Sequence, residues 1–537
     1  MKKCKKTALL MAVIMCLTTL LTSCGGSVET QGDERFTKAT TPDTYPIETD
    51  VTLRYWGGLH ADIMAAHTSA NETELAKYLI EETGINVVYE HPVAGQESAS
   101  FNIMVNSDEL PDIIARQWSS HTGGPQKAID DGIITPLNDY IDLVSPNLKK
   151  ILDENPEYKA AIMTDKGDIF EYPMIKGGDK LLTYVTYGIR KDLLDKAGLD
   201  LPETLADWEK TLYTFRDMGV EVPLSVRLNN ELMALIAPFM GCFRVTGTFF
   251  HEDGTVKYGP YEEGFGEWIK LMKKWYDDGI LDKDFADVDN KRRSAMVTNG
   301  RNGAIEGSVG GNFGTWLAAI KPESGIEYVP VKVPVMNEGD TAFWTQKDWH
   351  VRDCVAISAT SKHKELAARF LDYGFSEKGA MTYNFGREGI SYTMVDGVPT
   401  YNPDLRDPEK NGGLSFSQAL SEHLRANTGG PFVQDTRYID QYYALDIQKK
   451  AFDMWDSDTL EYKMPPVQLT ADEQKTYTDI MTPIDTYREE TVAKLISGKM
   501  DISKLDEYFA ELKRLGIEEA IEIQQAAYDR YAARINK

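Results

Sequence analysis

The sequence predicts an α/β protein in which strands alternate with helices. Residues 51–56 alternate β-branched and aromatic side chains and end at two glycines, which is typical of a strand followed by a loop. Residues 72–82 carry apolar side chains at helical spacing before Gly84, and residues 85–89 form a second strand pattern. The apolar run at residues 111–115 is typical of a buried parallel strand. This alternation indicates a first lobe with a mainly parallel sheet.

The rest of the chain predicts more helix than strand. Residues 168–173 and 182–189 are expected to be extended, and residues 354–358 to form a later strand. Apolar side chains at helical spacing predict helices at residues 192–197, 205–218, 263–278, 366–373, 505–515 and 521–535. Trp208, Trp268 and Trp275 lie on such helices and are expected to be core residues.

The N-terminus predicts a secreted protein with a lipid anchor. Four lysines precede an apolar run of about 15 residues, which is shorter than the roughly 20 residues of a membrane-spanning helix and typical of a signal peptide. Residues 21–24, Leu-Thr-Ser-Cys, fit the lipobox of a bacterial lipoprotein, which makes Cys24 the lipidation site after cleavage of residues 1–23. An ordinary signal peptide that happens to end near a cysteine is the alternative. The polar residues 24–49 are expected to form a flexible tether.

Charge and cysteine content exclude several kinds of partner. The formal net charge is −26, and removal of the four N-terminal lysines makes it more negative still, which argues against nucleic acid or an anionic lipid surface as partner. Cys242 and Cys354 show no metal-binding spacing; they are expected to be isolated core residues, with a disulfide as the alternative. The acidic run at residues 277–289 lacks the glycine at position six and the terminal glutamate of an EF-hand loop. We therefore expect a solvated acidic face and no metal.

Motifs spread over most of the chain resemble one protein family. They lie at residues 84–87, 110–113, 132–137, 167–173, 187–210, 275–282, 384–401 and 526–531. Together they resemble the family 1 extracellular solute-binding proteins of ABC importers, and most of all the large lipoprotein branch of Gram-positive bacteria that is linked to carbohydrate uptake. Gly25, after the lipobox cysteine, carries no acidic retention signal of the Gram-negative kind, in keeping with this branch.

The resemblance implies a two-lobed periplasmic-binding-protein-like fold of type II, with discontinuous lobes, hinge strands and a helical C-terminal part. We expect residues 50–163 and 336–379 in lobe 1, and residues 164–335 and 380–537 in lobe 2. It also implies a monomeric binder without a cofactor, which captures an oligosaccharide in a cleft between the lobes and delivers it to the membrane permease subunits of an ABC importer. Its place would be the extracellular face of the cell membrane, which it touches only through the lipid anchor.

Two other functions remain open at this stage. Aromatic clefts also suit a peptide or another non-sugar solute. A surface-anchored enzyme acting on glycosides would need two carboxylates about 5–10 Å apart, and 84 acidic residues leave that possibility open. The sequence has neither a GxSxG nor an HExxH motif, and no repeats of the kind found in adhesins, so a non-catalytic binder is favoured.

A sugar offers apolar C–H faces and a rim of hydroxyls, which suit aromatic rings and planar polar side chains beyond strand ends. The candidates are Trp56 and His60 after the first strand, Gln117 and Trp118 after the strand at residues 111–115, Tyr184 and Tyr187 on a presumed hinge strand, Asn312 and Trp316 in a glycine-rich turn, Trp344 and Trp349 in an aromatic cluster, and Arg387 and Glu388 in a glycine-flanked loop. Each has a structural alternative, such as core packing for the tryptophans, a packed hinge for the tyrosines and mutual pairing for Arg387 and Glu388. Arg190 is expected to pair with a local carboxylate such as Asp192.

Overall fold

The computed structural model describes residues 36–107, 109–183, 185–228, 239–343, 347–443, 445–455 and 460–535. The chain divides into a short N-terminal unit, residues 1–37, and a body, residues 38–537. The predicted signal peptide and Cys24 lie outside the described residues. Among the described residues, no helix combines the length and the apolar character that a membrane span requires.

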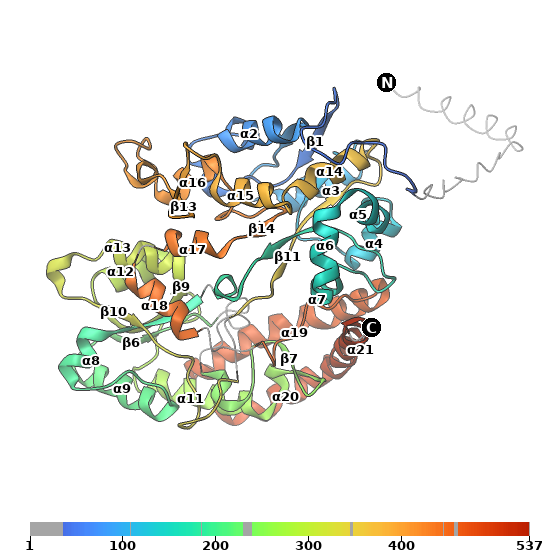
Figure 1. The fold of residues 1–537 in the computed structure, drawn as a ribbon. Helices are drawn as coiled ribbons and strands as arrows, with labels where there is room; N and C mark the ends of the chain where they lie inside the picture. The colour runs from blue at the N-terminus through green and yellow to red at the C-terminus, as the bar shows by residue number, and fades with distance from the viewer. Residues whose placement is uncertain are drawn as a thin grey trace, which may run out of the picture. The chain divides into compact units, whose positions relative to one another are not determined.

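A six-stranded sheet forms one part of the body (Figure 1). Its strands, in spatial order, are β14 (Val433–Gln434), β4 (Tyr172–Lys176), β11 (Val351–Ile357), β3 (Ile113–Ala115), β1 (Thr52–Trp56) and β2 (Asn86–Glu90). β1 pairs in parallel with β2 and β3, and β14 with β4, whereas β11 is antiparallel to both β3 and β4. The sheet is therefore mixed, because β11 enters from a distant stretch of chain and not through a right-handed crossover.

A four-stranded sheet forms the second part. Its order is β10 (Tyr328–Pro330), β5 (Val185–Arg190), β9 (Asn302–Ser308) and β6 (Val222–Ser225). α9 (Leu205–Asp217) and α11 (Glu263–Asp277) contribute to the large hydrophobic core beside it. Trp208, Trp268 and Trp275 are fully buried in that core, so their prediction as packing residues is confirmed.

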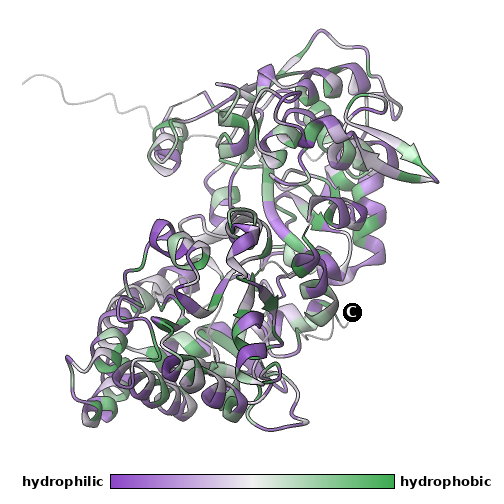
Figure 2. Ribbon diagram, turned by 90° about the vertical axis from the view of Figure 1, so that its left-hand side faces the viewer, coloured by the Kyte–Doolittle hydropathy of each residue, from purple (hydrophilic) through white to green (hydrophobic). Residues whose placement is uncertain are grey.

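Helices pack around both sheets, and in Figure 2 hydrophobic residues alternate with hydrophilic ones along them, as expected for helices with one buried face. α2 (Glu74–Thr83) shows how local sequence sets such a helix. The Thr73 side chain accepts a hydrogen bond from the Ala76 N–H at its start, and Gly84 ends it in a left-handed conformation with φ 72°. A Cβ on Gly84 would lie 2.3 Å from the Ile47 carbonyl oxygen, so this position requires glycine.

Three helices complete the chain: α19 (Ala471–Ser497), α20 (Leu505–Arg514) and α21 (Ile517–Ile535) (Figure 1). The predicted last two helices are confirmed, while α19 is additional. α19 packs on α11 and on α21, and α21 also contacts α7 (Pro156–Ala161). The Arg534 guanidinium donates a hydrogen bond of 3.0 Å to the Met163 carbonyl. The C-terminal helices thus connect the core of the four-stranded sheet with helices beside the six-stranded sheet.

The six-stranded sheet draws its strands from well-separated stretches of chain, so the chain passes between the two sheets more than once. β1, β2, β3 and β11 come from the residues predicted for lobe 1. β4 and β14 also belong to this sheet, although the sequence predicts their residues in lobe 2. The exact limits of the lobes stay a prediction.

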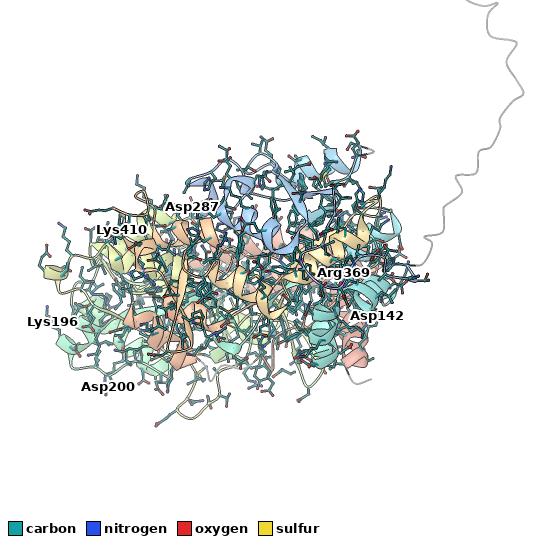
Figure 3. The ribbon with its side chains drawn as sticks, turned by 45° about the horizontal axis from the view of Figure 1, so that its top comes forward. Asp142, Lys196, Asp200, Asp287, Arg369 and Lys410 are labelled. Atoms are coloured by element: carbon teal, nitrogen blue, oxygen red, sulfur yellow. The ribbon has the colours of Figure 1, made fainter. Side chains whose placement is uncertain are left out.

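Part of the predicted tether packs on the body. The Glu365 carboxylate, on α14 (Lys364–Tyr373), accepts hydrogen bonds of 2.6 Å from the backbone N–H groups of Thr40 and Thr41. The Tyr45 hydroxyl donates one of 2.6 Å to the carbonyl of Arg369, which is labelled in Figure 3. Residues 40–45 are thereby held against this helix.

Candidate ligand-binding site

A cavity of about 660 Å³ opens at one edge of the six-stranded sheet. It is of the size of small-molecule sites, which span roughly 300–1,000 Å³. Its walls come from residues at or beyond the carboxyl ends of β1, β2, β3, β4 and β14, from the amino-terminal half of β11, from residues 425–430 and from α17 (Thr436–Tyr442). Because β11 runs antiparallel, its first residues lie beside the carboxyl end of β3. Such an edge leaves backbone groups and loops available to a ligand.

Two glycines follow β1 and leave room beside the cavity. A Cβ on Gly57 would lie 2.9 Å from the Ala115 Cβ. Glycine therefore allows the loop after β1 to approach the last residue of β3 this closely. His91 fixes the same loop, since one ring nitrogen bonds the Gly57 carbonyl at 2.9 Å and the other accepts from the Ala70 N–H at 3.0 Å. Both nitrogens of His91 are therefore occupied by the protein itself.

Four tyrosines bring aromatic surface to the cavity: Tyr55, Tyr89, Tyr438 and Tyr443. Tyr55 and Tyr89 face each other in the register of β1 and β2, with ring centroids 5.0 Å apart. Burial raises the pKa of Tyr89 to about 12, so its hydroxyl stays protonated and can both donate and accept hydrogen bonds. An apolar ring face with a polar tip suits a hydroxylated ligand.

Two cavity arginines have no carboxylate partner among the described ion pairs. The Arg116 guanidinium carbon lies 3.7 Å from the centroid of the Phe101 ring, in cation–π contact, and burial lowers the pKa of Arg116. The Arg425 guanidinium donates hydrogen bonds to the Ser421 and Leu424 carbonyls at 2.6 and 2.8 Å. Both side chains thus bring a positive charge that the protein does not neutralise by direct pairing.

A second group of cations surrounds one carboxylate. The Lys176 ammonium lies 3.2 Å from Asp348, and burial lowers the pKa of Lys176 to about 8. Arg352 and Lys463 approach the same carboxylate at 3.7 and 3.9 Å. Lys176 and Arg352 both line the cavity, so this group leaves a local excess of positive charge there.

Asp353 is the one acidic side chain in the described lining of the cavity. Its carboxylate accepts hydrogen bonds from the Ser119 hydroxyl and, at 2.9 Å, from the Ser119 N–H. Behind it lies Glu171, which is fully buried and accepts from the Cys354 N–H at 2.9 Å. Burial and the neighbouring Asp353 raise the pKa of Glu171 well above its ordinary value, and burial raises that of Asp353. Both carboxyls therefore hold their protons to a higher pH than exposed carboxyls do.

The sequence of the chain matches one known protein family. Residues 69–381, more than half of the chain, match the family described as "Bacterial extracellular solute-binding protein". The chain belongs to this family of bacterial extracellular solute-binding proteins. Its members bind a solute, so the prediction of a binder and not an enzyme is confirmed at this level.

Known relatives cover almost the whole of this solute-binding protein. It is 25% identical over 522 residues to the fructooligosaccharide ABC transporter substrate-binding protein FusA of Streptococcus pneumoniae, covering 92% of this chain and 93% of FusA. It is 23% identical over 357 residues to Lipoprotein LipO of Bacillus subtilis, covering 63% and 68% of the two chains. The crystal structure of the alginate-binding protein AlgQ2 without calcium ion aligns with a TM-score of 0.70 at 23% identity, over 90% of this chain and 99% of AlgQ2. The predicted two-lobed α/β fold is thereby confirmed.

Of the residues that the sequence predicts for ligand binding, His60 lines the cavity. It accepts a hydrogen bond from the Asp62 N–H at the start of α1 (Ala61–Met64), and 44% of its side chain is exposed. Trp56 is 8% exposed and packs near Phe101. Trp118 is 0% exposed and donates from its indole N–H to the Ile114 carbonyl at 3.2 Å.

Other predicted residues serve the fold of this solute-binding protein. Tyr187 and Trp316 are each 2% exposed and belong to hydrophobic cores, which is the packing alternative for both. The Asn312 side chain accepts from the Ser308 N–H at 3.0 Å and holds its own turn. The Trp349 indole N–H donates to the Met464 carbonyl at 2.9 Å. None of these four residues lines the cavity.

The remaining predictions lie on the surface or outside the described residues. Gln117 and Glu388 are exposed and do not line the cavity. Arg387 pairs with Glu81 at 2.9 Å and not with Glu388. Arg190 pairs with Asp192 at 2.6 Å, as predicted. Tyr184 and Trp344 lie outside the described residues.

Cys242 and Cys354 are both free thiols, in agreement with the expectation of isolated residues. Among the residues that the structure describes, no three histidine, cysteine, aspartate or glutamate side chains gather so as to hold a metal ion. Within the acidic run at residues 277–289, Asp282 pairs instead with Arg292 at 3.0 Å.

Proposed function

We propose that this extracellular solute-binding protein captures an oligosaccharide in the cavity and delivers it to the permease of an ABC importer. The observation that carries the proposal is the cavity itself, where tyrosine rings stand beside planar polar side chains at the carboxyl edge of a sheet. Tyr55 and Tyr89 offer ring surface, whereas Asn427, Gln434 and the arginines offer hydrogen-bonding groups. FusA, similar along most of the chain, is named for fructooligosaccharides, and this supports the same ligand class here.

Unpartnered polar atoms in the cavity wall also support a hydroxylated ligand. Arg116 Nη1, Asn427 Oδ1 and Thr428 Oγ1 are buried and have no hydrogen-bond partner. Buried polar groups without a partner cost free energy. A hydroxyl both donates and accepts, so sugar hydroxyls suit a donor such as Arg116 Nη1 as well as an acceptor such as Asn427 Oδ1.

We propose His60 as a ligand contact together with the four cavity tyrosines. Gln117 and Glu388 are exposed outside the cavity lining, and the other predicted contacts, Trp56, Trp118, Tyr187, Asn312, Trp316, Trp349 and Arg387, would reach a ligand only after rearrangement of the packing or pairing described above.

The place of action that we propose is the outer face of the cell membrane, with a lipid on Cys24. The lipobox of residues 21–24 supports this anchor. A relative that is itself named a lipoprotein, LipO of Bacillus subtilis, supports it further. A lipid-held binder stays near its permease in a cell without an outer membrane, because several acyl chains together bind a bilayer firmly.

A thermal-shift screen tests the proposed function. The chain from Gly25 onward is melted with kestose, other neutral and charged oligosaccharides, and peptides, and each mixture is analysed for products. A ligand that binds only the folded state adds about 2.7 kcal/mol at a hundredfold excess over its dissociation constant. We expect a raised melting temperature with at least one oligosaccharide and no product. A shift with peptides alone, or turnover of a glycan, would refute the proposal.

A further inference from the structure

The charge of the cavity is opposite to that of the chain. The chain has a formal net charge of −26. Four of the cavity residues are cationic, namely Arg116, Lys176, Arg352 and Arg425, and within the described lining Asp353 alone is acidic. Outside the cavity, charged residues of both signs lie on the surface, such as the labelled Lys196, Asp287 and Lys410 of Figure 3. Positive charge is therefore concentrated where the ligand is proposed to bind.

The hydrogen-bond and ion-pair partners of the cavity arginines differ from those of several arginines elsewhere. Arg190 pairs with Asp192 at 2.6 Å and Arg293 with Glu306 at 2.7 Å, whereas the buried Arg369 donates to the Thr41 hydroxyl at 3.2 Å. Arg116 has no ion pair among the described residues, and its Nη1 is buried without any hydrogen-bond partner. A half-buried guanidinium without a counter-charge is costly, because desolvation disfavours its charge, and the contacts of Arg116 with the Phe101 and Trp118 rings offset only part of this cost.

Arg425, which also lines the cavity, likewise has no carboxylate in direct contact among the described ion pairs. Its hydrogen bonds go to the neutral acceptors Ser421, Leu424 and Thr73. These contacts hold the guanidinium in place without neutralising it. A fixed, planar guanidinium is the side chain best suited to bind a carboxylate or sulfate in two-pronged fashion.

The acidic groups near the cavity offset only part of this charge. Glu422 interacts electrostatically with Arg425 without a direct ion pair among the described residues. Asp348 is shared by three cations, Lys176, Arg352 and Lys463. Asp353 is held by Ser119 and adjoins the buried Glu171, whose pKa is raised well above its ordinary value by burial and by Asp353. A negatively charged ligand would therefore meet more cations than carboxylates.

We propose that the oligosaccharide captured in this cavity carries an anionic group, a carboxylate or a sulfate ester, which Arg116 and Arg425 bind with Lys176 and Arg352 nearby. The inference rests on the proposed function and narrows its ligand class to acidic glycans. The tyrosines cover the sugar faces, and the cations select the charged unit.

Binding of chemically matched pairs tests the proposal. Calorimetric titrations of the chain from Gly25 onward compare trigalacturonate with its methyl ester, 3′-sialyllactose with its methyl ester, and 6-sulfo-N-acetyllactosamine with N-acetyllactosamine; kestose is added as a neutral ligand. We expect the charged member of at least one pair to bind at least tenfold more tightly at low salt, with an advantage that shrinks as the ionic strength rises. Preference within the carboxylate pairs or the sulfate pair identifies the source of the charge.

Two single substitutions locate the effect. Arg116→Gln and Arg352→Gln each remove one cavity cation, and we expect each to reduce the preference for the charged glycan severalfold, because the charged glycan loses more affinity than its neutral partner. Arg514→Gln is the matched control, since Arg514 is an exposed residue of α20 that pairs with Glu511. It should leave the preference unchanged. Arg425 is left intact, because its hydrogen bonds to Ser421 and Leu424 hold the loop that it lies on. Thermal melting confirms that each variant is folded.

Three results would contradict the inference in whole or in part, and they differ in what else they refute. If neutral glycans bind and their charged partners bind no better, the acidic ligand class is wrong and the proposed function stands. If neither the charged nor the neutral glycans bind, the proposed function fails as well. A preference that is unchanged in both Arg116→Gln and Arg352→Gln would refute the role of these two side chains in binding the charged group.

Discussion

Lys176 gives the cavity a charge that depends on pH. Burial lowers the pKa of Lys176 to about 8, with Asp348, Arg352 and Lys463 around it. An anionic glycan binds best while the ammonium is charged, so we expect its affinity to fall as the pH rises through 8, by up to roughly tenfold per pH unit. The measurement is the dissociation constant between pH 6.5 and 9.5.

The contribution of Lys176 to the free energy of unfolding changes with pH in the opposite direction to the affinity. Between pH 8 and the ordinary lysine pKa of about 10.4, the unfolded chain binds the proton that folded Lys176 has lost, so this group makes the folded state more stable as the pH rises. Lys176→Arg keeps the positive charge at high pH and should make the affinity for the anionic glycan depend less on pH. Part of the dependence should remain, because burial also lowers the pKa of Lys463. A neutral glycan whose affinity fell equally would contradict this assignment.

Trp118 and Gln117 are adjacent in the sequence, but only Trp118 is buried, so their substitution should have different effects on stability. Trp118 is fully buried, so Trp118→Ala should lower the free energy of unfolding by about 3–5 kcal/mol through the cavity it creates. Gln117 is exposed, and Gln117→Ala should change stability by less than about 0.5 kcal/mol. Urea denaturation of both variants checks the two values. A ligand affinity lost in Gln117→Ala would show that this residue contacts the ligand after all.

Strand alternation explains why the sequence predicts the region of the site better than its residues. Successive side chains of a strand point to opposite faces, and the sequence alone does not say which face is covered. On β1, Tyr55 lines the cavity, whereas Trp56 is buried in the interior. Arg116 likewise lines the cavity next to the predicted Gln117. Arg425 follows no strand that the pattern predicts, so nothing local marks it.

At the scale of elements, the contact between residues 40–45 and α14 makes a separate prediction. Glu365 accepts hydrogen bonds from both the N–H and the hydroxyl of Thr40 and of Thr41. Glu365→Ala removes all of them, so we expect faster hydrogen exchange of these two amides and a loss of about 1–2 kcal/mol in unfolding free energy. Glu522→Ala, an exposed change in α21, is the control. Unchanged exchange at Thr40 and Thr41 would contradict the described contact.

Elements with long apolar periodicity are predictable, and elements that exist through distant pairing are not. α9, α11, α20 and α21 lie within a few residues of their predicted ranges because one face of each is apolar. β14 has only two residues and is a strand because β4 lies beside it. The antiparallel course of β11 through the centre of the sheet depends on the return of the chain from its second half, which local pattern does not encode.

At the scale of the whole molecule, the lipid anchor is testable in cells. Cys24→Ser removes the sulfur that would carry the lipid, and we expect the protein to move from the membrane fraction to the medium while the purified soluble chain keeps its ligand affinity. Fractionation followed by immunoblotting measures the distribution, with Cys242→Ser, a buried thiol of the body, as the control. Retention of the Cys24→Ser protein at the membrane would refute the anchor.

The most direct test of the central claim, that the cavity at the edge of the six-stranded sheet holds the oligosaccharide, is a calorimetric titration of the chain from Gly25 onward. The titrant is the glycan that gives the largest thermal shift, and wild type is compared with Tyr55→Ala and Arg387→Ala, each shown to be folded. We predict one site per chain, affinity at least tenfold weaker in Tyr55→Ala, and wild-type affinity in Arg387→Ala, because Arg387 lies outside the cavity. Loss of binding in Arg387→Ala with wild-type affinity in Tyr55→Ala would contradict the claim.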